Sequence, residues 1–194
     1  MTDNKKTDSR IIRSKRDLAV ALEELLEEKN FDDISITEIT SKAMVSKNTF
    51  YNNFEDKNEL LQFLFRRYAD QVHEEIEKVL LKESSIEDTL YEIDKIIVHF
   101  FYNSRLSFEK IVKNDKSKNL YWAMNSFVKK LITETIERYP SYFSKSIPVN
   151  FVGYIYSGAI SNTIYFMFND ETKIDEDKCV DYIYEIITPK LLES

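Results

Sequence analysis

Glycine and proline are almost absent from this chain, with two glycines and three prolines among 194 residues. Turns, hairpins and bulges depend on these two residues, because glycine reaches positive φ without strain and proline fixes φ in a turn. Hydrophobic residues nevertheless make up 43% of the chain and aromatic residues 13%, which is enough for a sizeable core. The sequence therefore predicts an all-α protein whose helices are joined by short connections.

Apolar residues recur at spacings of three and four along most of the chain, which is the period of an amphipathic helix. No stretch keeps the alternation of a half-buried strand for long. We expect two domains, residues 1–55 and 56–194, bridged by a long helix that starts near Asp56. The expected helices cover residues 9–28, 36–43, 47–53, about 57–82, 85–103, 107–113, 118–139, 150–169 and 175–192.

Two short helices in residues 35–54 carry strong start signals. Ser35 and Glu38 form a capping box, in which the serine oxygen accepts an orphan backbone N–H and the glutamate reaches back. After a tight turn, Ser46 can cap the next helix. Phe50 and Phe54 fall four residues apart in that helix and are expected to point inward. This pattern predicts a helix-turn-helix, the geometry that reads a major groove.

The second of these helices presents polar side chains that suit nucleic acid, listed here with the groups that they can contact. Lys47 can bond guanine or a phosphate, Asn48 and Asn52 an adenine edge, Thr49 a thymine methyl or a phosphate, and Tyr51 and Lys57 a phosphate. A solvated polar face is the alternative, because short helical hairpins with polar faces are common.

Charge gives this interpretation little support. The net charge is −7, and it divides into −1 for residues 1–69 and −6 for the remainder. Nucleic-acid binders are often basic over a whole domain, so any DNA contact must depend on local arrangement. The first 16 residues do hold a local excess of four positive charges, from Lys5, Lys6, Arg10, Arg13, Lys15 and Arg16 against Asp3 and Asp8. A solvated, frayed terminus is the alternative explanation of this basic segment.

The stretch "SITEITSKAMVSKNTFYNNFEDKNELL" resembles the amino-terminal domain of tetracycline-repressor-type (TetR/AcrR) regulators. The resemblance covers about residues 10–65 and implies DNA contact by Ser46, Lys47, Thr49, Tyr51 and Lys57. Two positions depart from the family pattern. Met44 stands where the family usually has glycine, and Asn48 stands where it often has glycine. The first substitution requires a negative φ or accepted strain, and the second changes the operator preference or adds a base contact.

The carboxy-terminal part is more weakly similar to the effector-binding and dimerisation half of the same family. "YIYSGAISNTIYFMFND" and the last helix are similar to the two helices that pair with a partner subunit. The small residues Gly153, Ser157, Gly158 and Ser161 would let such helices approach closely. The alternative is a helix buried within one chain.

A small-molecule pocket is also implied by the resemblance. His99 and Asn103 in "HFFYN", with Trp122 and Asn125 in "YWAMN", would place polar groups among many aromatic rings. The alternative is that these aromatic residues simply fill the core, because aromatics at helical spacing usually pack.

These features predict a ligand-responsive repressor that binds a palindromic operator as a homodimer. A helical protein-interaction module without DNA binding is the alternative. Residues 146–169 carry no charge and are long enough to span a bilayer, but their polar residues favour a buried or dimer-forming helix. His73, His99 and Cys179 match no catalytic or metal motif, so we expect no enzyme activity, metal or cofactor. The single cysteine and the polar amino terminus favour the cytoplasm.

Overall fold

A computed structural model describes residues 2–82, 85–103, 112–113, 118–140, 147–169 and 174–187 of the chain. Its regular elements in these ranges are all helical, and their order confirms the predicted all-α class. They are α1 (Thr2–Leu26), the 3-10 helix η1 (Phe31–Asp33), α2 (Ile36–Lys42), α3 (Lys47–Tyr51), α4 (Lys57–Leu80), α5 (Ile86–Asn103), α7 (Asn119–Arg138), α8 (Val149–Asn169) and α9 (Glu176–Ile187). The helix expected at residues 107–113 falls almost entirely outside the described residues.

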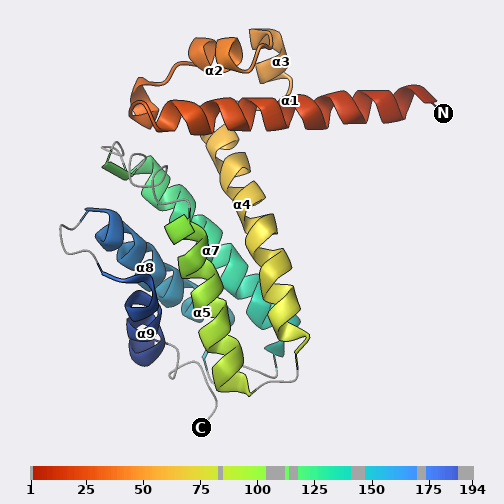
Figure 1. The fold of residues 1–194 in the computed structure, drawn as a ribbon. Helices are drawn as coiled ribbons and strands as arrows, with labels where there is room; N and C mark the ends of the chain where they lie inside the picture. The colour runs from red at the N-terminus through yellow and green to blue at the C-terminus, as the bar shows by residue number, and fades with distance from the viewer. Residues whose placement is uncertain are drawn as a thin grey trace.

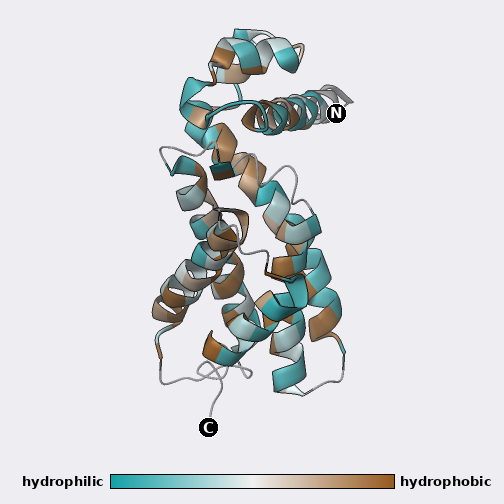
Figure 2. Cartoon of the chain, turned by 60° about the vertical axis from the view of Figure 1, so that its left-hand side comes forward, coloured by the Kyte–Doolittle hydropathy of each residue, from teal (hydrophilic) through white to brown (hydrophobic). Residues whose placement is uncertain are grey.

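The helices form a crosspiece on top of an upright bundle (Figure 1). In the crosspiece, α1 lies under α2 and α3, and α4 descends from it into the bundle of α5, α7, α8 and α9. Most helices carry both polar and apolar residues along their length (Figure 2), as expected of amphipathic helices around a core. The helix α1 is longer than predicted, because its helical backbone begins at Thr2 and not near residue 9.

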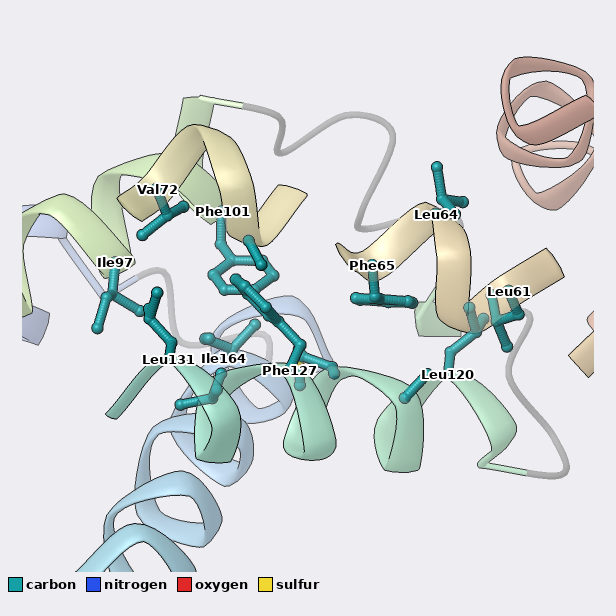
Figure 3. Packing of buried hydrophobic residues seen from close by; sticks show 14 of the residues in the cluster. Leu61, Leu64, Phe65, Val72, Ile97, Phe101, Leu120, Phe127, Leu131 and Ile164 are labelled. Atoms are coloured by element: carbon teal, nitrogen blue, oxygen red, sulfur yellow. The ribbon is translucent and has the colours of Figure 1, made fainter. Parts of the chain in front are cut away.

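The bundle core is built from aromatic and aliphatic side chains of three helices. Phe65 of α4, Phe101 of α5 and Phe127 of α7 point toward one another (Figure 3), with ring centroids 6.4 Å apart for Phe65–Phe127 and 6.3 Å for Phe101–Phe127. All three rings are at least 95% buried. Higher on the same helix, Leu61 lies beside Leu120 at the start of α7 (Figure 3). The helix α4, which begins at the crosspiece, thus packs within the bundle core along much of its length (Figure 1, Figure 3).

No helix in the described ranges is long and apolar enough to cross a membrane. This includes α8, which contains most of the uncharged segment noted in the sequence.

The turn between α2 and α3 has the geometry of a Schellman motif. The N–H of Val45 donates to the carbonyl of Thr40 (2.9 Å), and the N–H of Met44 donates to that of Ser41 (3.1 Å). This motif places its central residue in the left-handed region, and Met44 indeed has φ 54°. The strain noted as a possibility in the sequence is therefore present at Met44, whose side chain is 93% exposed.

We predict that Met44→Gly stabilises the protein. A left-handed non-glycine residue costs about 1–2 kcal/mol, and the extra flexibility of glycine in the unfolded chain returns about 0.5–1 kcal/mol of that cost. The free energy of unfolding in urea should rise by about 0.5–1 kcal/mol.

Met44→Ala is the matched control. It keeps the Cβ atom and removes only an exposed side chain, so its stability should match that of the parent chain. A destabilised Met44→Gly variant would show that the thioether side chain, and not backbone strain, determines the stability of this turn.

Candidate nucleic-acid interface

The helix α3 is fixed at its start by Ser46. The Oγ atom of Ser46 accepts a hydrogen bond from the N–H of Thr49 (3.0 Å) and lies 2.9 Å from the Thr49 hydroxyl. On the inner side, Phe50 is fully buried and Phe54 is 2% exposed, with ring centroids 5.9 Å apart. The expected cap and the two inward anchors are therefore confirmed.

The opposite side of α3 is a polar surface. Lys47, Asn48, Tyr51 and Asn52 are exposed, and these positions follow one another along one face of a helix. The phenol of Tyr51 is held on edge against Phe50, with 5.5 Å between ring centroids. Thr49 is half-buried and its hydroxyl is engaged with Ser46. The arrangement therefore presents one ammonium, two amides and a phenol on a short helix.

The far end of α3 is held by residues that the sequence did not single out. The side-chain N–H₂ of Asn53 donates to the carbonyl of Thr49 (2.7 Å) and to the hydroxyl of Ser14 in α1 (3.2 Å). The ammonium of Lys15 lies over the Phe54 ring at 5.5 Å and the Phe63 ring at 5.9 Å. In the sequence, Lys15 is one basic residue among several. Its contact with Phe54 joins distant parts of the chain, so no local pattern predicts it.

Charged side chains at both ends of α2 fasten it to the end of α1 and to the connector that follows α1. Its predicted capping box is present, and Lys29 also donates to Glu38. Hydrogen bonds from Lys29 and Ser35 lower the pKa of Glu38 to about 2, so this carboxyl stays ionised. At the other end, the ammonium of Lys42 lies 3.3 Å from Glu24 and 3.1 Å from Glu28. These contacts hold α2 as the platform for α3.

Lys57 does not project from the start of α4 as expected. Its ammonium donates to the carbonyls of Phe31 (2.8 Å), Asp32 (3.0 Å) and Ile34 (3.0 Å). It also lies 4.7 Å from the centroid of the Phe31 ring. The three donors of the ammonium are thus used by backbone carbonyls at the end of η1, one of which, that of Phe31, also accepts from the N–H of Ile34 (3.2 Å). A phosphate contact by Lys57 would require it to leave them.

The four residues expected around a ligand pocket do not converge. His99 and Asn103 are exposed and bond to each other (2.6 Å), and His99 also contacts Glu176 of α9 (2.6 Å). Trp122 is 61% exposed, and Asn125 lies 3.5 Å from the hydroxyl of Ser161. His99, Asn103 and Trp122 are exposed on α5 and α7 and Asn125 is half-buried beside Ser161, so a pocket lined by these four side chains stays a prediction.

The interior of the bundle instead holds a small apolar cavity. Its volume is about 20 Å³, and it is lined by Ile76, Leu90, Ile93, Ile97, Leu131, Ile132, Thr135 and Tyr156. The hydroxyl of Tyr156 donates to Asp94, which is fully buried. A ligand pocket usually measures about 300–1,000 Å³. The alternative that the aromatic residues fill the core therefore agrees with the buried Phe101 but not with Trp122, which is 61% exposed.

The small residues of α8 serve the packing within one chain. A Cβ atom on Gly153 would lie 2.5 Å from the methyl carbon of Thr133 in α7. Ser157 and Ser161 are 1% and 0% exposed, so they too lie inside the chain. Of the four predicted interface residues only Gly158 faces open space, with nothing within 4 Å of its Cβ position. Gly153 lies on the side of α8 that meets α7, and Gly158 does not.

Large apolar side chains are exposed on α8 and α9, beside charged residues on α9. The exposed large side chains on these two helices are Phe151, Tyr154, Ile155, Phe166, Tyr182 and Ile186. Their exposed fractions range from 43% to 74%. The sequence predicts the dimer interface from small residues, which allow helices to approach closely, and so it does not identify these six residues. We refer to these six residues as the α8–α9 apolar face.

The reactive side chains do not form a catalytic or metal site. Within the described residues, no group of three or more His, Cys, Asp or Glu side chains is placed to hold a metal ion. Cys179 is buried, and its thiol donates to the sulfur of Met167 (3.1 Å). Burial raises the pKa of the Cys179 thiol to about 11, which keeps it protonated. The expected role of Cys179 as a small core residue is confirmed.

A capped and anchored helix-turn-helix mounted on a helical bundle defines a class of DNA-binding protein. Residues 18–63 match the family described as "Bacterial regulatory proteins, tetR family". This segment of the chain is therefore similar to the TetR family of regulators. The matched segment contains the helix-turn-helix and the start of α4, as the resemblance predicted.

Two curated proteins are similar to part of the chain. An uncharacterized HTH-type transcriptional regulator of Bacillus subtilis, YxbF, is 31% identical over 94 residues, which is 48% of this chain and 24% of that protein. The HTH-type dhaKLM operon transcriptional activator DhaS of Lactococcus lactis is 24% identical over 121 residues, or 55% of this chain and 65% of that protein. Each match thus covers less than two thirds of the relative.

Solved structures share the fold over most of the chain. A TetR-family regulator from Syntrophomonas wolfei has a TM-score of 0.66 and 18% identity, covering 90% of this chain and 93% of its own. FadR of Thermus thermophilus, described as a repressor in complex with lauroyl-CoA, has a TM-score of 0.67 and 15% identity, covering 93% and 96%. At this level of identity the similarity shows the fold alone.

We predict that Lys57→Met destabilises the protein. The substitution removes three hydrogen bonds from a charged donor and leaves the carbonyls at the end of η1 without it. Hydrogen bonds to charged groups contribute about 1.5–3 kcal/mol, so the free energy of unfolding should fall by about that amount.

Asn58→Met is the control, because Asn58 is an exposed neighbour on the same turn of α4. Chemical unfolding of both variants decides the role of Lys57. If Lys57→Met left the stability unchanged and weakened DNA binding, Lys57 would be a phosphate contact, as the sequence predicts, and not a structural residue.

Proposed function

We propose that this protein is a ligand-responsive transcriptional repressor that binds a palindromic operator as a homodimer. The observation that carries the proposal is the exposed polar face of α3, which is held rigidly by Ser46, Phe50 and Asn53. Residues 1–55 are the proposed DNA-binding domain, and residues 56–194 are the proposed effector-binding and dimerisation domain. The proposed cellular location is the cytoplasm, where its DNA target lies, and the proposal includes no catalytic activity.

The side chains of α3 have separate proposed roles at the DNA. Lys47, Asn48 and Asn52 are exposed and carry groups that bond base edges. Tyr51 carries its hydroxyl at the rim of the same face, where a phosphate would lie. Ser46 and Thr49 order the first turn and add hydroxyls beside it. Asn48 provides a side chain where the family pattern often has glycine, so it is the residue through which this chain would acquire its own operator preference.

Dimerisation is proposed through the α8–α9 apolar face. Its six exposed aromatic and aliphatic side chains lie on two helices, and clustered apolar residues of this kind favour a protein partner. A two-fold symmetric pairing would make the same face meet itself. The α3 helices of the two protomers, as the recognition helices, would then enter successive major grooves about 34–36 Å apart.

The effector is proposed to bind within the bundle by enlarging its core. The cavity of about 20 Å³ has apolar walls from α4, α5, α7 and α8, with Tyr156 and Asp94 as its polar feature. A second hollow of about 330 Å³ opens between α4 and α7 and shares Ile76 and Thr135 with the cavity. The FadR structure from Thermus thermophilus was solved with lauroyl-CoA. An apolar ligand with a polar end is therefore the proposed class of effector.

We predict that Lys47→Ala and Tyr51→Phe weaken operator binding without lowering stability. Each change removes one exposed polar group from α3, and a contact of this kind contributes about 1–3 kcal/mol, or about 5- to 150-fold in affinity. The operator would be obtained first by selection from random-sequence duplexes, and its affinity would be measured by gel-shift titration.

Lys82→Ala is the control, because this exposed lysine lies at the far end of α4. Recovery of a palindrome supports the repressor. Recovery of no sequence above background would favour the interaction module, since the acidic balance and the Met44 and Asn48 departures agree with that alternative.

We predict that Ile155→Asp separates the dimer. The side chain of Ile155 is 57% exposed in the single chain, so the charge is solvated in the monomer and buried in the dimer. Light scattering should show a mass near 23 kDa for the variant and twice that mass for the parent chain.

Leu81→Asp is the matched control, because Leu81 is 82% exposed at the end of α4 and lies outside the α8–α9 apolar face. A dimer that survives Ile155→Asp and dissociates with Leu81→Asp would move the interface to the other end of the bundle.

A further inference from the structure

The amino-terminal part of α1 is a helical extension that contacts the rest of the protein through Ser14 and Lys15 but buries no described side chain. The first buried residue of α1 is Leu18, among the described side chains, although the helix begins at Thr2. Figure 1 shows this part extending past α3 to a free end. At 1.5 Å per residue, the 16 residues before Leu18 span about 24 Å. We call residues 2–17 the α1 extension.

The α1 extension carries basic side chains that face solvent. Arg10, Arg13 and Arg16 are all exposed and recur every third residue. Arg13 lies 3.8 Å from Asp17, in an exposed pair whose side chains are 84% and 43% accessible. Such an exposed ion pair contributes little to stability, so Arg13 can leave Asp17 and bind another anion at low cost. No carboxylate in the described residues forms an ion pair with Arg10 or Arg16.

Arg13 and Arg16 also border the turn that leads into α3. They line a groove of about 1000 Å³ together with Lys42, Met44 and Val45 of that turn. Glu24 on the same groove is compensated by Lys42, at 3.3 Å. Asp17 also lines the groove and pairs with Arg13, so Arg16 is the charge beside the turn that forms no ion pair with a carboxylate of the described residues. Ser46 and Lys47 follow directly, so the two arginines lie next to the proposed DNA-reading surface.

The geometry points to the α1 extension as a second DNA-binding element, in which Arg10, Arg13 and Arg16 contact backbone phosphates beside the major groove that α3 enters. Arginine suits this role because its planar group donates two hydrogen bonds to one phosphate. Phosphate contacts do not depend on the base sequence, and they position the protein on the duplex. This inference rests on the proposed DNA-binding function, and it explains how an acidic protein would bind a polyanion.

The experiment measures the salt dependence of DNA affinity. The test variant is Arg10→Gln/Arg13→Gln/Arg16→Gln, since glutamine keeps the helix propensity and removes the charge. The DNA is a mixed-sequence duplex of about 30 base pairs, long enough for two half-sites one helical turn apart. Each phosphate contact contributes about 0.9 to the slope of log affinity against log salt. The slope should therefore fall by about 2–3 per protomer, and the affinity at low salt should fall at least tenfold.

Two further variants make the outcome specific. Lys78→Gln/Lys82→Gln/Lys130→Gln removes the same charge from exposed positions on α4, its end and α7, and it should leave the slope unchanged. Arg10→Lys/Arg13→Lys/Arg16→Lys keeps the charge and should retain most of the slope. Circular dichroism and light scattering on all variants establish that the fold and the oligomeric state are unchanged.

The results separate this inference from the proposed function. If Lys47→Ala weakens DNA binding and the arginine triple variant keeps the parent slope, the role of the α1 extension is overturned and the repressor stands. If the parent chain binds no DNA, both are overturned. If the triple variant changes the oligomeric state instead of the slope, the extension is a self-association surface and the inference fails.

Discussion

The continuity of α4 is the constraint on which the rest of the structure depends. Its apolar residues pack against α1 near Leu60 and against α5 and α7 around Phe65 and Val72, in one buried cluster. Because both parts of the protein share this helix, neither can complete its core alone. The ammonium of Lys57 strengthens this junction by binding the carbonyls that end η1. The position of the crosspiece is thereby tied to the packing of the bundle.

The fold could be predicted from sequence because its signals are local. The scarcity of glycine and proline excluded a sheet protein, and the caps at Ser35, Ser46 and Asp56 located the starts of α2, α3 and α4. Phe50 and Phe54 were placed correctly, since spacing along a helix determines which side chains turn inward. The length of α1 was underestimated because its first residues are polar and carry no apolar period.

The candidate site was only partly predictable, because side-chain partners come from distant parts of the chain. Lys57 was expected at a phosphate, but the carbonyls that it binds belong to residues more than 20 positions earlier. The small residues of α8 were expected outside, but Gly153 meets Thr133 of α7. His99 and Trp122 are both exposed and do not line a common pocket. Tertiary packing determines which side of α5 and α7 faces the core, and the sequence pattern alone does not reveal it.

The length of α4 has a mechanical consequence. A helix of 24 residues is about 36 Å long, so a tilt of about 5° at one end displaces the other by about 3 Å. In a symmetric dimer the two displacements add, and the distance between recognition helices changes by several ångströms against a groove repeat of about 34–36 Å. The cavity of about 20 Å³ beside α4 is too small for an effector, so under the proposed function a ligand would have to move this helix. A small expansion of the bundle would then change the spacing of the two α3 helices and weaken their fit to DNA.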